Sequence, residues 1–326
     1  APPAPSAGAG TPAPSPATPV PAETAPPAPA EPEVTPQSEL MAMVRSTPET
    51  ATLPLDVTIN YYKAAESSTF VTLTLEVKRS ALPPAFDPDT AILSAEAVDA
   101  ATGESQQRFF KAEHFGSYAG NPSATVNDTL LYQAERSFNP GIYKVMLALK
   151  DPASGQVGRM EKELVIPSFT DGDFTLSTVT LARKIERLAT PPEAGKILPF
   201  VLGNFTVVPR PDNVYKQGEE LTFYFQIYGP AVDEITKQPK VDLSYTFEKE
   251  VAGQWKMVGR QPVVTPNESK LVQAFGLPLT GWPAGSYRVA IKVTDTIASK
   301  TATSVVPFTI EGAAGGASKS KAKSKG

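Results

Sequence analysis

The stretch FNPGIYKVMLALKDPASGQVGRMEKELVI at Phe138–Ile166 has a counterpart, WPAGSYRVAIKVTDTIASKTATSVVPFTI, at Trp282–Ile310. The two copies match at the same spacing: Gly141, Tyr143, Val145, Leu147, Leu149 and Asp151 against Gly285, Tyr287, Val289, Ile291, Val293 and Asp295. Apolar residues at every second position after the tyrosine indicate a half-buried strand. Turn-forming residues and a second alternating run follow in each copy. The repeat therefore predicts two β-hairpins of one design.

The start of each hairpin, Gly-x-Tyr-x-Val, resembles the tyrosine corner of immunoglobulin-like sandwiches, in which the tyrosine hydroxyl bonds to backbone a few residues upstream. The corner residues are Gly141 and Tyr143 in the first copy and Gly285 and Tyr287 in the second. In antibody domains the second residue after this tyrosine is cysteine, whereas both copies here have valine. This difference favours fibronectin-like or bacterial immunoglobulin-like variants.

Length and composition set the outer limits. The chain has 326 residues, which is enough for two domains with sizeable cores. It has no cysteine, so disulfides and thiolate chemistry are excluded. The formal charge of -4 argues against a general nucleic-acid-binding protein. No apolar run approaches the length of a membrane span.

Both ends of the chain are of low complexity. Residues 1–36 hold 13 of the 34 prolines, which predicts a solvated, disordered tether over residues 1–50. Within it, Ser38–Arg45 could form a short helix capped by Ser38. Residues 312–326 predict a flexible tail whose lysines touch an anionic surface or simply keep this end solvated.

Short alternating runs separated by turn signals fill the rest of the chain. In residues 51–168 they are Thr69–Lys78, Ala91–Val98, Gln106–Ala112, Val126–Ala134 and the first hairpin. In residues 169–311 they are Phe174–Leu188, which could end in a helical turn, Phe200–Pro209, Glu220–Tyr228, Val241–Glu248, Gln254–Val258, Lys270–Phe275 and the second hairpin. This pattern predicts an all-β fold: two tandem immunoglobulin-like or fibronectin III-like antiparallel sandwiches with disordered tails.

Several of these stretches, in this order, resemble a known group of proteins. They include LMAMVRSTPETATLPLDVTINYY, LSTVTLARKIERL and FTVVPRPDNVYKQGEELTFYFQIYG, together with both hairpins. They are similar to the C-terminal β-sandwich region of bacterial von Willebrand factor A-related and GWxTD-domain proteins. The resemblance implies exported, all-β modules without an established activity. Both the A-domain and the GWxTD motif are absent, so no functional residue is carried over.

The residue types needed for catalysis are scarce. His114 is the single histidine and has no evident triad partners. One histidine without cysteine cannot form a structural zinc site. Two loop pairs, Asp87 with Asp89 and Asp171 with Asp173, could offer oxygen ligands to calcium, although aspartate is also a common turn residue. We therefore expect no enzyme and no cofactor.

Aromatic residues supply the candidate binding surface. In the run Glu220–Tyr228, Tyr224 and Tyr228 share the face opposite the apolar residues, about 13 Å apart. With Trp255 they could contact a sugar chain or a protein, or the face could be covered by a loop or by the other domain. An enzyme using carboxylates alone is a third alternative.

These observations predict a non-catalytic, extracytoplasmic structural or protein-interaction module. Its partner would be an unidentified protein. We expect neither nucleic-acid binding nor a membrane span. The alternative is a carbohydrate-binding module that uses exposed aromatics to bind a polysaccharide.

Overall fold

The computed structural model describes residues 53–64, 68–103, 105–114, 125–126, 129–170, 172–193, 197–260 and 271–312. For residues 105–114 and 125–126, and at Arg260, it describes the backbone alone. The predicted tether, the helix at Ser38–Arg45 and the lysines of the tail lie outside these ranges. All described residues belong to one compact unit.

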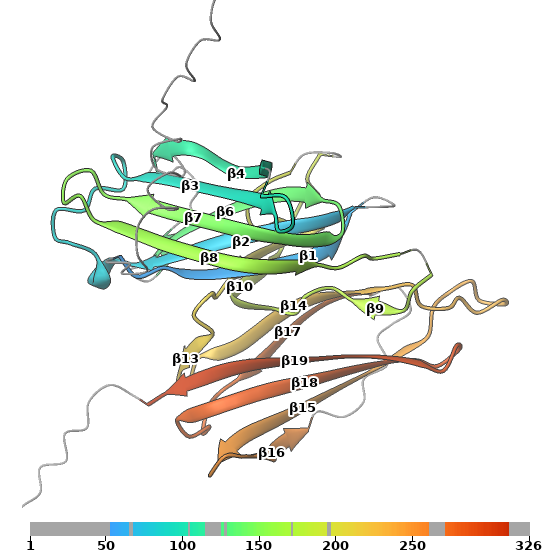
Figure 1. Ribbon diagram of the computed structural model, residues 1–326. Helices are drawn as coiled ribbons and strands as arrows, with labels where there is room; N and C mark the ends of the chain where they lie inside the picture. Colours follow the sequence, from blue (N-terminus) through green and yellow to red (C-terminus); the bar gives the residue numbers. More distant parts are fainter. Residues whose placement is uncertain are drawn as a thin grey trace, which may run out of the picture. The chain divides into compact units, whose positions relative to one another are not determined.

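The regular secondary structure of the described chain is almost entirely strand (Figure 1). The strands are β1 (Asp56–Lys63), β2 (Thr69–Lys78), β3 (Ile92–Asp99), β4 (Ser105–His114), β5 (Thr125–Val126), β6 (Thr129–Phe138), β7 (Gly141–Lys150), β8 (Val157–Ile166), β9 (Thr175–Leu176), β10 (Thr180–Arg187), β11 (Val201–Leu202), β12 (Phe205–Pro209), β13 (Val214–Lys216), β14 (Glu220–Tyr228), β15 (Val241–Val251), β16 (Gln254–Arg260), β17 (Val272–Pro278), β18 (Gly285–Asp295) and β19 (Lys300–Glu311). In these ranges the sole helical element is the 3-10 turn η1 (Arg79–Ala81), and no helix could cross a membrane.

The first sandwich consists of two four-stranded antiparallel sheets, ordered β1-β2-β6-β5 and β4-β3-β7-β8. Alternate residues of β2, from Val71 to Val77, point into the space between the sheets and pack there against Val145 and Leu147 of β7. In this order β1 and β2 share one sheet with the later strand β6, and the repeated hairpin, β7-β8, pairs with β3 in the other. It is the arrangement of an immunoglobulin-like sandwich.

The second sandwich repeats this plan with additions. Its sheets are ordered β11-β12-β10-β14-β17, with β9 beside β14, and β13-β19-β18-β15-β16. The hairpin β18-β19 occupies the same place as β7-β8. The extra hairpin β11-β12 extends one sheet, and β13 joins the other by pairing in parallel with β19. The fold class predicted from the sequence, all-β with immunoglobulin-like sandwiches, is confirmed.

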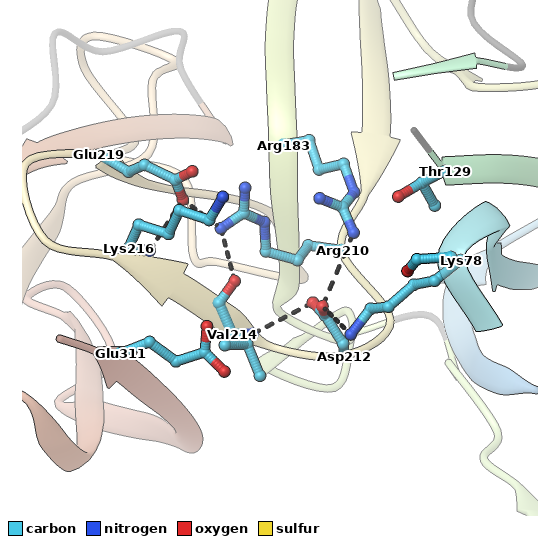
Figure 2. Close-up of a pocket in the computed structure, with 10 residues that line it drawn as sticks. Lys78, Thr129, Arg183, Arg210, Asp212, Val214, Lys216, Glu219 and Glu311 are labelled. Atoms are coloured by element: carbon cyan, nitrogen blue, oxygen red, sulfur yellow. Dashed lines mark hydrogen bonds and ion pairs between the residues drawn. The ribbon is translucent and has the colours of Figure 1, made fainter. Parts of the chain in front are cut away.

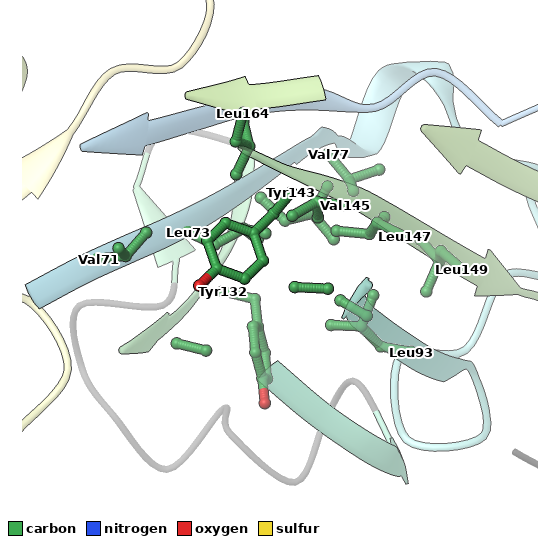
Figure 3. Packing of buried hydrophobic residues seen from close by; sticks show 14 of the residues in the cluster. Val71, Leu73, Val77, Leu93, Tyr132, Tyr143, Val145, Leu147, Leu149 and Leu164 are labelled. Carbon is green, nitrogen blue, oxygen red and sulfur yellow. The ribbon is translucent and has the colours of Figure 1, made fainter. Parts of the chain in front are cut away.

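Each repeated hairpin carries the same tyrosine contact. Tyr143 lies inside the first core beside Leu73 and Tyr132 (Figure 3), and its hydroxyl donates to the carbonyl oxygen of Asn139 at 3.0 Å. Tyr287 is 1% exposed and donates to the carbonyl oxygen of Pro283 at 2.6 Å. Both acceptors lie four residues upstream. These bonds tie the incoming loop to the first residues of the strand.

Two glycines open these strands for different reasons. Gly285 has a φ of 147°, and a β-carbon there would come within 2.8 Å of the Lys249 side chain. At Gly141 a β-carbon would meet the Tyr143 ring at 3.3 Å. The glycine at the first position therefore gives the tyrosine or its neighbour room to pack.

One expectation from the sequence concerns the end of the run Phe174–Leu188. β10 remains a strand to Arg187, so the helical turn expected at the end of Phe174–Leu188 is wrong. Hydrogen bonds to β12 explain this, because they pair Ile185, Glu186 and Arg187 with Val207, Thr206 and Phe205. Tertiary pairing here overrides the local helical propensity of Ala-Arg-Lys-Ile-Glu-Arg.

Candidate functional site

The structure places the predicted aromatic residues in two different environments. Tyr224 is fully buried, with its ring centre 6.2 Å from that of Tyr62 in the first sandwich. Tyr228 is half-buried, and its hydroxyl accepts a hydrogen bond from the backbone N–H of Lys63 at 3.0 Å. The interpretation of Tyr224 and Tyr228 as an exposed binding surface is therefore wrong. The face that carries them is covered by the first sandwich.

Burial also changes the acidity of these phenols. It raises the pKa of Tyr224 to about 12. The pKa of Tyr228 is raised as well, chiefly by burial, although the N–H of Lys63 opposes the shift. Both hydroxyls therefore stay protonated; that of Tyr228 bonds across the contact between the sandwiches, and that of Tyr224 bonds to Leu202 and Gln226 within the second sandwich.

This contact, the junction, joins the outer face of sheet β1-β2-β6 to the outer face of β12-β10-β14. The outward residues of β2 are polar, yet Thr72, Thr74 and Glu76 are at most 2% exposed. Apolar side chains from both sandwiches meet in the same layer; they are Tyr62, Leu131, Ala182, Phe200, Leu202, Val207, Val208 and Tyr224. The junction is therefore a mixed layer of apolar and polar groups.

Hydrogen bonds cross the junction at several points. Gln133 of β6 accepts at Oε1 from the backbone N–H of Phe200 across the junction at 2.6 Å, and a bond from its Nε2 to Thr74 Oγ1 of the same sheet, at 2.8 Å, orients its amide. Tyr61 and Thr178 exchange two bonds: the Tyr61 N–H donates to Thr178 Oγ1 at 2.9 Å, and the Thr178 N–H donates to the Tyr61 carbonyl at 3.0 Å. These bonds need a definite orientation of both partners, so they fix the register between the sandwiches.

A buried ion pair lies at one side of the junction. Glu76 of β2 accepts a short hydrogen bond from Arg183 of β10, and the two side chains are 0% and 9% exposed. Asp212 lies between Arg183 and Lys78, with its Oδ2 at 3.8 Å and 3.2 Å from their terminal nitrogens. Burial raises the pKa of Glu76 above its ordinary value, while the Arg183 guanidinium opposes the shift.

Next to this pair lies a cavity of about 230 Å³ that residues of both sandwiches line (Figure 2). Figure 2 shows Lys78 and Arg183 converging on Asp212, while Arg210 points toward Val214 and Glu219. Arg210 donates to Glu219 Oε2 at 2.6 Å. The lining holds Lys78, Arg183, Arg210 and Lys216 against Asp212, Glu219 and Glu311, with Glu76 behind them. Four cations and four carboxylates balance, so this network suits the joining of domains better than the capture of an ionic ligand.

A second carboxylate, Glu135 of β6, is buried at the junction and 8% exposed. Burial raises its pKa to about 7, against the lowering effects of the Arg136 charge and the Phe200 N–H. Its Oε1 is buried and accepts no hydrogen bond from any residue that the structure describes. Glu135 is therefore a group at the junction that titrates near neutral pH.

Two buried aspartates have a structural role that the sequence analysis did not identify. Asp151 directly follows β7, Asp295 is the last residue of β18, and both are 0% exposed. Asp151 accepts from the N–H of Ala153 at 3.1 Å, and Asp295 accepts from the N–H of Ile297 at 2.9 Å. They fold the hairpin turns through Asx-type bonds. Their matched positions in the repeated stretch were the available signal.

The structure describes only some of the remaining candidate residues. The side chain of His114 and all of Asp171 lie outside the described residues. Asp87 accepts from the N–H of Asp89 at 3.0 Å, which is the bond of a local turn. In the described ranges, no group of three or more His, Asp or Glu residues is placed to hold a metal ion.

Trp255 remains at the surface, on the outer face of sheet β13-β19-β18-β15-β16, and is 37% exposed. The Arg288 guanidinium carbon lies 4.5 Å from its ring centre, and Arg288 Nε donates to Glu248 Oε2 at 2.5 Å. Met257 follows on the same face and is 63% exposed.

No model of a known protein family and no curated protein matches the chain. Among solved structures, the three N-terminal domains of the outer capsid protein Hoc of bacteriophage RB49 are 11% identical, covering 79% of this chain and 70% of that one, with a TM-score of 0.21. The fibronectin(III)-like modules of Clostridium thermocellum CbhA are 12% identical, covering 79% and 95%, with a TM-score of 0.19.

The chicken interferon gamma receptor alpha chain is 11% identical, covering 78% of this chain and 98% of that one, with a TM-score of 0.22. These scores are too low to support an argument about function or about the arrangement of the sandwiches. The assignment of the fold rests on the strand order and the repeated tyrosine hairpins described above.

Proposed function

We propose that this protein is a non-catalytic, extracytoplasmic module that serves as a structural or protein-interaction unit of fixed geometry. The buried junction carries this proposal. A flexible linker would leave the polar face of β2 in water, whereas here Thr74 and Glu76 are fully buried. Burying polar groups costs free energy unless they are bonded, and Gln133 and Arg183 supply those bonds.

The same burial weighs against an enzyme and against a carbohydrate-binding module. Glu76 and Glu135 have raised pKa values, but both are buried between the sandwiches, where a substrate has no access. Of the three aromatic residues proposed to bind a polysaccharide, Tyr224 and Tyr228 pack in the junction, so Trp255 alone is exposed for that role. The extracytoplasmic location rests on the resemblance to exported β-sandwich modules and is a prediction of its own.

Calorimetry of the full chain tests this function. Because the junction couples the sandwiches, we expect one endotherm in which both unfold together. Two separated endotherms would contradict a module of fixed geometry. Soluble xylan, mannan or hydroxyethyl cellulose should leave the midpoint unchanged. A polysaccharide-dependent rise that Trp255→Ala abolishes would favour the carbohydrate-binding alternative instead.

A further inference from the structure

Strand β16 lies at one end of its sheet, and in the described part of the chain it pairs with β15 alone. Residues 254–258 are all exposed, including the large side chains of Trp255, Met257 and Val258. Proteins commonly protect such edges with short strands, proline or charged side chains, lysine especially. The opposite end of the sheet follows this rule, since β13 has three residues. β16 has seven residues and no proline, and its mid-strand charge is the single Lys256; among the described residues no further strand covers its edge.

The hairpin geometry shows which backbone groups point outward. Ala252 and Gly253 have φ values of 53° and 75°, which define a two-residue turn of the primed type. In such a turn the N–H of Gln254 bonds to the carbonyl of Val251. Because bonded and non-bonded pairs alternate along an antiparallel ladder, the N–H and C=O groups of Trp255 and Met257 face away from β15.

The side chains beside this edge are already ordered. Glu248 pairs with Met257 and with Arg288 in the strand register, which places all three on the outer face. Arg288 bonds to Glu248 and stacks on Trp255. Holding the indole in place before binding reduces the conformational entropy lost when a partner arrives. Trp and Arg are also the residues most often found at the energetic centre of protein interfaces.

Charge selects the kind of partner. Lys256 lies directly opposite Lys249 in the ladder, and such like-charged pairs are destabilising. Lys249 donates to the carbonyl of Ala284 at 3.0 Å, while Lys256 has no ion pair with any side chain that the structure describes. An acidic residue on an added strand would offset this charge. A second copy of the chain fits poorly, because QWKMVGR contains two cations and no acid.

We propose that the open edge of β16 binds an extended acidic segment of a partner protein as an added β-strand. The segment would alternate apolar residues, which contact Trp255 and Met257, with Asp or Glu residues, which contact Lys256. This is the mode of recognition in which main-chain hydrogen bonds give affinity and alternate side chains give specificity. The inference deepens the proposed function, since it names the partner class of an interaction module.

Peptide selection on the immobilised full chain tests the proposal. The probe is a library of random ten-residue peptides, and selected sequences are titrated against wild type by intrinsic fluorescence in the Trp282→Phe background, where Trp255 is the only tryptophan. We expect peptides that alternate apolar and acidic residues. Met257→Pro should weaken their binding at least tenfold, because it removes an outward donor without removing a bond to β15. Lys256→Glu should do the same by reversing the charge.

Lys292→Glu is the matched charge-reversal control, since Lys292 is exposed on the face that carries Trp255 but is distant from the edge in the register; it should change the dissociation constant less than twofold. Failure to select any peptide, selection without acidic alternation, or equal binding to Met257→Pro would each overturn the proposal. So would dimerisation of wild type that Met257→Pro abolishes, because the occupant would then be a second copy. A single calorimetric endotherm alongside any of these results would leave the proposed function standing.

Discussion

Replacement of Arg183 by methionine is expected to lower the free energy of unfolding by about 3 to 5 kcal/mol. The substitution leaves the Glu76 carboxylate, which is fully buried, without its cationic partner. The nearby Asp212 would then add repulsion in place of a shared ion network. Replacing both residues, Glu76→Met with Arg183→Met, removes the uncompensated charge and should recover most of the loss.

Urea unfolding followed by circular dichroism measures this effect. Lys184→Met is the matched control, because Lys184 is the next residue on β10 and its ion pair with Glu186 is exposed on both sides. Exposed pairs contribute about 0 to 1 kcal/mol, so the control should change stability little. If Arg183→Met proved no more destabilising than Lys184→Met, or if the double variant were the least stable, the buried pair would not hold the junction.

The stability of the protein should fall as pH rises from about 4.5 to about 7, and Glu135 is the main cause. Its pKa is raised to about 7 in the folded chain because the carboxyl is buried. Below the ordinary glutamate value both states bind the proton, so the full stability is present there. Above it the unfolded chain loses the proton while the folded chain keeps it, and the loss reaches about 3 kcal/mol near neutral pH.

Glu135→Gln retains the size of the side chain and removes its titration. We expect this variant to show a much flatter dependence of stability on pH between 4.5 and 7 than wild type, with the residual slope coming from Glu76, whose pKa burial also raises. Glu161→Gln is the control: Glu161 lies between Lys144 and Arg159, which lower its pKa. Identical pH profiles for wild type and Glu135→Gln, measured by urea unfolding at each pH, would rule out Glu135 as the cause.

The repeated hairpins could be predicted because their signal is local. Alternation, a glycine and a tyrosine at fixed spacing specify a strand and its turn, and β2 and β14 begin and end at the expected residues. The role of Asp151 and Asp295 was within reach of the same pattern, since both follow directly after the alternating run. The parallel pairing of β13 with β19 could not be predicted, because the three residues of β13 are too few to show an alternation of apolar and polar residues.

Alternation reveals two faces of a strand but not what covers the polar one. Thr72, Thr74 and Glu76 have the pattern of a solvated face, although the second sandwich buries them. The same limit explains the misplacement of Tyr224. One usable signal was the scarcity of lysine on β2 and β6: the outer face of β6 has none, and that of β2 has only Lys78 at its end. Strand faces in contact with water usually carry lysine.

The central claim is that the junction holds the two sandwiches in one orientation. The chain has no cysteine, so spin labels attach only at introduced positions. Glu163→Cys on β8 and Lys292→Cys on β18 place one label on an exposed site of each sandwich. Double electron–electron resonance should give one narrow distance distribution that persists at high salt, because buried bonds are little screened, and that broadens when Arg183→Met is added. A broad or bimodal distribution in the otherwise unaltered chain would contradict the claim.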